Sequence, residues 1–465
     1  MEIAFYGAAR AVTGSKHLIT LNNGTKILLD CGLFQGMGNV TEGLNQHFGF
    51  EPSALDYVVL SHAHIDHCGL LPRLVAEGFS GNIFCTPPTM DLARILLMDS
   101  AKISMQDAEY ANRHIKTSEE QEMPLYTEED VIRTLGQFKV LDYGEELEID
   151  PRVKLQFTDA GHIIGSAAVH LAIVEDGKET QITFSGDVGR YGDLILKSPQ
   201  RYAQADYLIM ESTYGDSLHK DFGPIEESLY EIIRETCEVK KGKVVIPAFS
   251  VGRTQELLFA LNALELKGRL PDLAYYVDSP LSMQATQVLK NHPEAYNNGV
   301  KQLMKIDEDV FNFKGLKFIE SVQESKALNT DGRPCVIIAS SGMAEGGRVR
   351  HHIRNTIGNP KNTILMVGYA DPGSLAGKLL AGEHSVWLFG EAHDVLADVR
   401  SIRSMSAHGD YEDLLKFLGC QDPEQVKQLF LVHGEYEVQQ LFAQRLREKG
   451  FRNVAIPEFK QKFRL

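Results

Sequence analysis

The first two hundred residues alternate between short apolar runs and polar or glycine-containing turns, a pattern typical of short β-strands. Strands are predicted at residues 26–29, 57–60, 153–157 and 181–184. Polar residues with candidate chemistry follow each of these runs. The first part of the chain is therefore expected to carry its functional groups at strand ends.

Helices are predicted after the second of these strands, at residues 70–77 and 90–98. In the second helix apolar residues recur at spacings of three and four, which gives it one apolar face. The segment 101–126 that follows is polar, charged and helix-prone. Two interpretations stay open for it, a lid over a functional site and a solvated connecting helix.

From about Asp206 the pattern changes to apolar strands that alternate with helices, which indicates a parallel sheet with crossover helices. Each predicted strand ends in a polar or glycine-rich loop, and ligands of open parallel sheets bind outside the carboxyl ends of the strands. Helix starts beyond these loops offer backbone N–H groups suited to phosphate, although glycines that merely close tight turns explain any single loop as well. The predicted strands are residues 207–210, 244–248, 274–277, 335–339 and 363–367.

Composition narrows the class of protein. The chain has 465 residues, 43% hydrophobic and 24% charged, as expected of two or three globular domains. Six cysteines are scattered without a CxxC pair, and no signal peptide or apolar run of bilayer length is visible. We therefore expect a cytoplasmic protein with reduced thiols and no membrane association. The formal net charge of −16 argues against a broadly basic nucleic-acid coat but not against a local basic cleft.

The densest group of potential ligands is the sequence Ser-His-Ala-His-Ile-Asp-His at residues 61–67, directly after a predicted strand. Alternation would put His62 and His64 on one face, while Asp66 and His67 follow after the chain turns. Histidine with carboxylate is the ligand set of a zinc enzyme rather than of a cysteine-rich structural zinc site. Two metal ions could share this loop. The alternative is that these are three surface histidines beside an acid, without a metal-binding role.

Three further strand ends carry acids or histidines. They are Asp30 before Cys31-Gly32, His162 in Gly-His-Ile-Ile-Gly-Ser, and Asp187 in Ser-Gly-Asp. With the HAHIDH stretch, and in this order, they resemble the motifs of the metallo-β-lactamase superfamily. The resemblance implies that His162 is a metal ligand, that Asp187 bridges two metals, and that Asp30 orients a ligand loop from the second coordination sphere.

Later motifs make the chain similar to the β-CASP branch of that superfamily, which processes nucleic acids. Its candidates here are Glu211 in Glu-Ser-Thr-Tyr-Gly, His408 in Ser-Ala-His-Gly-Asp, and His433 in Leu-Val-His-Gly-Glu. The resemblance implies an α/β fold, a metallo-β-lactamase αββα sandwich with an inserted β-CASP domain built on a parallel sheet. The expected limits are 1–206 and 399–465 for the metallo-β-lactamase domain and 207–398 for the β-CASP domain.

The resemblance also implies a zinc-dependent ribonuclease with two Zn²⁺ per chain, which would leave 5′-phosphate and 3′-hydroxyl ends. Whether it cuts internally or from an end is left open. One zinc would be held by His62, His64, His162 and Asp187, and the other by Asp66, His67, His433 and the shared Asp187.

By the same resemblance, His408 is the candidate for protonating the leaving 3′-oxygen or holding a phosphate oxygen, and Glu211 for orienting its imidazole. Both are expected opposite the metals across the domain interface. A structural His408 packed in a turn is the alternative. Asp66 counts as catalytic because it would hold the second metal, and Asp410 is expected to play a weaker supporting role than Asp30.

Single-stranded RNA is the expected partner, a homodimer is compatible with the sequence, and no membrane is expected. Lys378 stands where the family often has Arg, in a loop near Tyr369 that departs from the family pattern, so one phosphate contact there is expected to differ. For Arg348 the alternative to a phosphate contact is that its side chain caps or braces its own helix. The expected RNA phosphate contacts are Arg253, Ser340, Ser341, Gly342, Arg348 and Lys378.

Three other functions fit parts of the pattern. A small-molecule hydrolase would share the HAHIDH stretch but would lack the inserted domain and His433. A DNA-directed β-CASP enzyme commonly has no histidine at the last motif, so His433 favours RNA. A non-catalytic scaffold is expected to lose metal ligands, whereas every ligand position is filled here.

Overall fold

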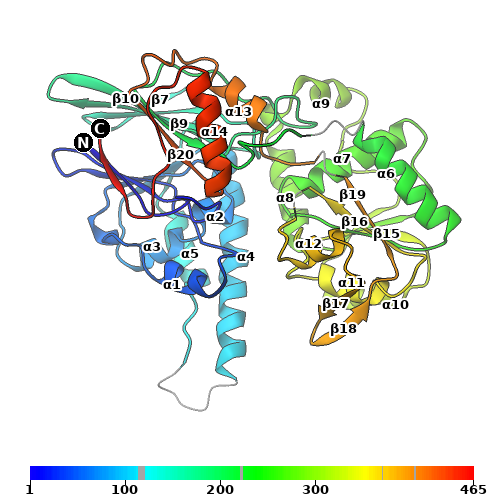
Figure 1. Ribbon diagram of the computed structural model, residues 1–465. Coiled ribbons are helices and arrows are strands. Elements are labelled where there is room, and N and C mark those ends of the chain that lie inside the picture. The colour runs from blue at the N-terminus through cyan, green and yellow to red at the C-terminus, as the bar shows by residue number, and fades with distance from the viewer. Residues whose placement is uncertain (114–120, 220–223, 369, 403–404) are drawn as a thin grey trace. The chain divides into compact units, whose positions relative to one another are not determined.

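The computed structural model describes residues 1–113, 121–219, 224–368, 370–402 and 405–465 (Figure 1). The chain forms two compact units. The first consists of Met1–Leu218 and His408–Leu465, and the second of His219–Ala407. The domain limits expected from the sequence place the inserted domain at 207–398. These limits stay a prediction.

The first unit is built on two seven-stranded sheets. One has the order β22-β1-β2-β3-β4-β5-β6, formed by β1 (Glu2–Phe5), β2 (His17–Thr20), β3 (Lys26–Leu29), β4 (Tyr57–Val59), β5 (Asn82–Cys85), β6 (Phe138–Val140) and β22 (Lys462–Arg464). The other has the order β21-β20-β11-β10-β9-β8-β7, formed by β7 (Glu146–Asp150), β8 (Val153–Asp159), β9 (Ala167–Glu175), β10 (Lys178–Phe184), β11 (Tyr207–Glu211), β20 (Gln428–Val432) and β21 (Val454–Ala455).

The core of this unit lies between the two sheets. Alternate residues of the short strands point inward, so that Ile3 and Phe5 of β1 join Phe157, Phe184 and Phe430 of the other sheet in one apolar cluster. The rings of Phe5 and Phe430 are 5.2 Å apart, centroid to centroid. Burial of these aromatic rings holds the sheets face to face and fixes where their strand ends meet.

Helices cover the outer faces of both sheets (Figure 1). Phe417 of α13 and Phe442 of α14 pack against Met210 and Leu431 of the second sheet, while α4 lies beside β6 of the first. This αββα sandwich confirms the predicted fold of the first unit. Its helices are η1 (Gly38–Val40), α1 (Thr41–Gln46), η2 (Pro52–Ala54), α2 (Ile65–Cys68), α3 (Leu71–Ala76), α4 (Pro87–Asn112), α5 (Glu128–Leu135), α13 (Tyr411–Leu418) and α14 (Tyr436–Glu448).

The second unit has a six-stranded sheet in the order β14-β13-β15-β12-β16-β19, with parallel pairing throughout. This sheet confirms the predicted α/β insertion with crossover helices. Its strands are β12 (Val244–Pro247), β13 (Ala274–Val277), β14 (Leu316–Phe318), β15 (Cys335–Ala339), β16 (Thr363–Val367) and β19 (Asp398–Ile402). The helices are α6 (Ile225–Ile233), η4 (Arg234–Val239), α7 (Arg253–Leu266), α8 (Pro280–Asn291), η5 (Pro293–Ala295), α9 (Asn298–Leu303), α10 (Val322–Thr330), α11 (Val349–Thr356) and α12 (Leu375–Leu380), and a separate hairpin joins β17 (Ser385–Leu388) to β18 (Glu391–Asp394).

The assignment of β11 to the inserted sheet is wrong. The sequence places residues 207–210 at the start of that sheet, but β11 pairs in parallel with β10 and β20 of the first unit. Leu208 to Glu211 are all buried, so the strand has the continuous apolar pattern of any inner strand of a parallel sheet. Such a pattern does not say which sheet the strand joins.

The predicted helix at 70–77 is α3, and the predicted helix at 90–98 lies in the first half of the longer α4. Thr86 caps α4 by accepting a hydrogen bond from the Thr89 N–H. The helix continues into the segment 101–126, which the sequence analysis interprets either as a lid or as a connecting helix. Residues 114–120 of that segment lie outside the described residues. No helix in the described part of the chain is both long enough and apolar enough to span a bilayer.

Candidate metal centre

The HAHIDH residues lie where buried β4 ends and the one-turn helix α2 begins. Backbone hydrogen bonds hold this loop in place, because Cys31 N–H donates to His67 O at 2.7 Å and Ser15 N–H donates to Asp66 O at 2.8 Å. Gly32 is required at this approach, since a Cβ there would lie 1.6 Å from Asp66 O. The ligand loop is therefore clamped by the strand ends beside it.

A first group of candidate ligand atoms comes from His62, His64, His162 and Asp187, of which all but the half-buried His64 are buried. Nδ1 of His64 lies 3.1 Å from Nε2 of His62 and 3.2 Å from Nε2 of His162. Oδ2 of Asp187 lies 3.5 Å from Nε2 of His62 and 3.6 Å from Nε2 of His162. Three imidazole nitrogens and one carboxylate oxygen from three separate motifs thus lie close together, and their role as metal ligands stays a prediction.

A second group consists of Asp66, His67 and His433. Oδ2 of Asp66 lies 3.3 Å from Nε2 of His433 and 4.0 Å from Nε2 of His67. The other oxygen of Asp187, Oδ1, lies 3.3 Å from Nε2 of His67. Because its two oxygens face the two groups separately, Asp187 has the position of a bridging carboxylate.

The donor set fits metal ions. Two atoms bound to one tetrahedral zinc at about 2.0 to 2.1 Å lie about 3.3 Å apart, close to the spacings within the first group. Nε2 of His67 and Oδ1 of Asp187 are buried and have no hydrogen-bond partner of normal geometry among the described residues. Lone pairs that face one another in a buried place repel unless a cation lies between them.

Hydrogen bonds behind the ligands turn their lone pairs toward the centre. Asp30 accepts from the Ser61 hydroxyl at 2.9 Å, and Ser61 Oγ is 3.1 Å from Nδ1 of His62. Thr213 Oγ1 lies 3.0 Å from Nδ1 of His433 and donates to His433 O. Both hydroxyls are thus placed to accept from Nδ1, which leaves Nε2 of each imidazole as the electron-pair donor.

The charge state of the first ligand group favours the same conclusion. Burial lowers the pKa of His62 and of His162 well below the usual imidazole value, although Asp187 opposes the shift. Burial would raise the pKa of Asp187, but His433 and His67 outweigh it and hold that pKa well below its usual range. His62 and His162 are therefore neutral beside an ionised carboxylate, and these are the forms that bind metal. Burial would also lower the pKa of His67, but Asp187 and Asp30 outweigh it and raise that pKa well above the usual imidazole value.

His408 and Glu211 lie beside this cluster and within the same unit. Nδ1 of His408 is 3.2 Å from Oε1 of Glu211 and 3.9 Å from Oδ2 of Asp187. The expectation that the pair faces the metals across the domain interface is therefore wrong, because β11 and its Glu211 belong to the first unit. Burial lowers the pKa of His408, but the Glu211 carboxylate and then Asp187 outweigh it and raise that pKa to about 9.

Asp410 has a different position from Asp30. Its side chain accepts hydrogen bonds from the backbone N–H groups of Glu412 and Asp413, and together with Asp413 it forms a capping box at the start of α13. That cap lies two residues after His408 and fixes the end of the loop that carries the imidazole. Asp30, by contrast, touches a ligand directly, since its Oδ2 lies 2.6 Å from Nδ1 of His67.

The expected phosphate contacts all belong to the second unit, and none of them is part of the two candidate ligand groups described above. Arg253 is buried and paired with Glu256. Arg348 donates to Asp278 at 2.6 Å and to two backbone carbonyls, whereas Lys378 on α12 is exposed. These contacts favour the bracing role of Arg348. The expected RNA contacts stay predictions, including those of Ser340, Ser341 and Gly342, and Tyr369 lies outside the described residues.

Sequence reasoning missed the hydroxyl groups that orient the imidazoles. Ser61 and Thr213 both stand inside stretches that the motifs already marked, one directly before His62 and the other two residues after Glu211. A small hydroxyl residue next to a ligand was the available signal. It is a weak one, because serine and threonine are common at strand ends for reasons of turn geometry.

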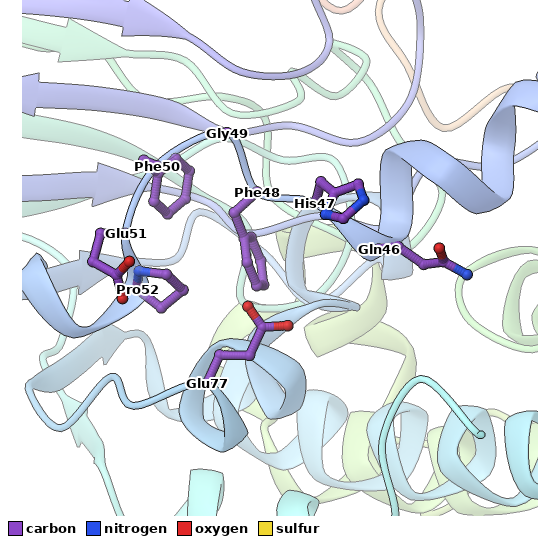
Figure 2. Close-up of a pocket in the computed structure, with 8 residues that line it drawn as sticks. All are labelled: Gln46, His47, Phe48, Gly49, Phe50, Glu51, Pro52 and Glu77. Carbon is purple, nitrogen blue, oxygen red and sulfur yellow. The ribbon is translucent and has the colours of Figure 1, made fainter.

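A separate open pocket of about 550 Å³ lies in the first unit and contains none of the cluster residues (Figure 2). Phe48 and Glu77 point toward one another across it. Glu77 already accepts a hydrogen bond from Arg73 at 2.6 Å, and Arg73 also donates to Gln46 O at 2.9 Å. Glu77 and the Gln46 carbonyl, which both line the pocket, are therefore already hydrogen-bonded to Arg73.

Three parts of the sequence match known protein families. Residues 12–83 match the metallo-beta-lactamase superfamily, residues 254–379 the Beta-Casp domain, and residues 392–457 the Zn-dependent metallo-hydrolase RNA specificity domain. The αββα sandwich with these domains defines a metallo-hydrolase of the lactamase type.

Curated relatives narrow the class further. Ribonuclease TTHA0252 of Thermus thermophilus is 35% identical over 94% of this chain and 94% of its own length. An RNase J-like protein of Methanocaldococcus jannaschii is 30% identical over 98% and 97%, and the transcription termination factor FttA of Methanosarcina mazei is 31% identical over 94% and 67%. The chain therefore belongs to the β-CASP family of metal-dependent nucleases, as the motifs implied.

Proposed function

We propose that this protein is a zinc-dependent ribonuclease that hydrolyses RNA phosphodiester bonds to 5′-phosphate and 3′-hydroxyl ends. The observation that carries the proposal is the pair of ligand groups that share Asp187, in a chain whose relatives include a ribonuclease and an RNase J-like protein. His62, His64 and His162 would hold one ion with Asp187. Asp66, His67 and His433 would hold the other with the same carboxylate.

Two zinc ions at these positions would supply a water-derived nucleophile near neutral pH and would draw charge from the phosphate oxygens. The residues of the chain supply the rest. Burial of the imidazoles excludes bulk water, and the Asp30 and Thr213 hydrogen bonds keep two of the ligand rings in fixed orientations. The centre is therefore organised before substrate arrives.

The second chemical task is protonation of the leaving 3′-oxygen, and we assign it to His408. Glu211 engages Nδ1 and favours the protonated imidazole, so Nε2 is the nitrogen that would carry the transferred proton. Glu211 is itself fixed, because it accepts a hydrogen bond from Val188 N–H at 2.6 Å. Val188 directly follows Asp187 in the chain, so this hydrogen bond connects the Glu211–His408 pair to the loop that carries the proposed bridging ligand.

RNA is favoured over DNA by His433, and the RNA specificity domain match at 392–457 includes both His408 and His433. The test is cleavage of single-stranded RNA by the zinc-loaded protein, compared with Asp66→Asn. The variant should keep its fold by circular dichroism and lose hydrolysis, and the wild-type products should accept ligation at their 5′-phosphates. Unchanged turnover in Asp66→Asn would remove the second ligand group from the reaction.

A further inference from the structure

His433 is held in a backbone conformation with positive φ. Its φ is 50°, in the region that residues other than glycine seldom adopt. Hydrogen bonds hold it there, since its N–H donates to Ala8 O at 2.7 Å and its carbonyl accepts from Ser212 N–H at 3.1 Å. The N–H of the next residue, Gly434, donates to Ala11 O at 3.2 Å. Two of these three contacts therefore come from one loop near the N-terminus.

That loop, residues 7–14, has a strained backbone of its own. Ala8 and Arg10 have φ angles of 47° and 57°. The two ends of the loop touch, because a Cβ on Gly7 would lie 1.6 Å from Gly14 O. Non-glycine residues keep such angles only where the surrounding structure holds them. The loop that receives the His433 N–H is therefore expected to depend on contacts outside itself.

Arg10 is the side chain that makes such contacts. Its guanidinium carbon lies 4.3 Å from the centroid of the Tyr436 ring, and its Nη1 lies 2.8 Å from Oε1 of Glu458. Its Nη2 also donates to Ile456 O at 3.5 Å. Tyr436 is the first residue of α14 and comes three residues after His433. Arg10 thus connects the loop to the helix that begins just beyond the candidate ligand.

The contact with Tyr436 is expected to matter more than the ion pair. The Glu458 side chain is 65% exposed, and exposed ion pairs contribute little to stability. A guanidinium is planar, so it can lie on an aromatic ring and still pair with a carboxylate at its edge. A lysine ammonium has no such plane and acts as a point charge. Arginine is therefore the residue suited to this position.

We propose that Arg10 is a positioning residue for His433. It acts through the carbonyls of Ala8 and Ala11 and through the start of α14. By keeping these groups in place it would maintain the direction of the His433 imidazole, whose Nε2 lies 3.3 Å from Oδ2 of Asp66. The inference rests on the proposed function, because it concerns the zinc affinity of the second ligand group.

The test measures the zinc affinity of the two ligand groups separately, by stepwise removal with a chromophoric chelator. Asp66→Asn identifies the step that belongs to the second group. Arg10→Ala should lower the affinity of that group roughly tenfold and leave the first group unchanged, as expected for a residue outside the ligand shell. With cobalt in place of zinc, the visible absorption of one ion only should change. Arg10→Lys should show a smaller loss.

Two controls separate positioning from general stability. Arg452→Ala is the matched variant, because Arg452 pairs with Glu424 at 2.7 Å on the exposed surface of the same unit, and it should leave both affinities unchanged. Arg10→Ala combined with Tyr436→Ala should bind zinc no more weakly than the weaker of the two single variants, because both changes remove one shared contact.

The outcomes separate this inference from the catalytic proposal. Unchanged zinc affinity of the second group in a folded Arg10→Ala protein would overturn it, while RNA hydrolysis by the wild type still supported the proposed function. If Arg10→Ala does not fold, Arg10→Lys decides in the same way. Equal losses at both groups, or additive losses in the double variant, would overturn it in favour of a general structural role. A wild-type protein that binds no zinc would reject the proposed function and this inference together.

Discussion

Oδ2 of Asp30 lies 2.6 Å from Nδ1 of His67, and both groups are buried. Since a carboxylate only accepts, the Nδ1–H of His67 donates to it, and Nε2 is left facing Asp187 Oδ1 at 3.3 Å. The backbone N–H of Ser61 donates to the other oxygen of Asp30 at 2.7 Å. One carboxylate therefore ties the orientation of His67 to the start of the HAHIDH loop.

Asp30→Asn should weaken metal binding at the second ligand group by roughly ten- to a hundredfold, because an amide is a poorer partner for the ligand imidazole. Competition with a chromophoric chelator would measure the affinity. Asp410→Asn is the matched control, since asparagine can still cap α13 and should leave zinc affinity unchanged. Equal losses in both variants would indicate a general loosening of the unit and would count against a specific role for Asp30.

His408→Ala should reduce the rate of RNA hydrolysis about a hundredfold or more while zinc content stays at the wild-type value. A substrate with a nitrophenolate leaving group needs no proton on departure, so the variant should recover part of the loss with it. Glu211→Gln should show the same pattern to a smaller extent, because it acts through the imidazole. The same loss on both substrates would assign His408 to phosphate positioning or to structure.

Much of the grouping of these side chains was predictable because each candidate ligand follows a short apolar strand, and strand ends of facing sheets meet. HAHIDH, His162, Asp187 and His433 are each marked in this way. The position of Glu211 was not predictable, since the buried pattern of β11 fits an inner strand of either sheet. Because β11 pairs with β10 and β20, Glu211 and its partner His408 lie in the first unit with the cluster. The sequence alone did not show this pairing, and the expected position of His408 across the domain interface was therefore wrong.

Arg348 gives a test in which bracing and RNA binding predict different results. It donates to Asp278, which is 0% exposed, and the same carboxylate accepts from His352 at 2.6 Å. Arg348→Ala should therefore cost about 2 to 3 kcal/mol of unfolding free energy, measured by urea denaturation, because a buried carboxylate loses one charged partner. A stable variant whose RNA affinity falls, with a salt slope lower by about 0.7, would instead restore the predicted phosphate contact.

Lys16 should make stability depend on pH. It is fully buried, and its ammonium donates to Gly32 O at 2.7 Å. Burial lowers its pKa to about 7, with a small opposing effect of Cys31. Since the folded pKa lies below the unfolded one, the unfolded chain binds more protons between about pH 7 and 10, and stability should rise with pH there by up to about 1.4 kcal/mol per unit. Lys16→Met should flatten this slope in urea titrations, and an unchanged slope would exclude Lys16 as its source.

The central claim is that two metal ions share Asp187, and the zinc-to-protein ratio tests it most directly. Elemental analysis of the purified wild-type protein should find close to two zinc ions per chain, and Asp187→Ala should bind far less at both sites, because its two oxygens face the two ligand groups separately. A folded Asp187→Ala protein with the wild-type zinc content, or a wild-type protein that hydrolyses RNA with no metal present, would contradict the account.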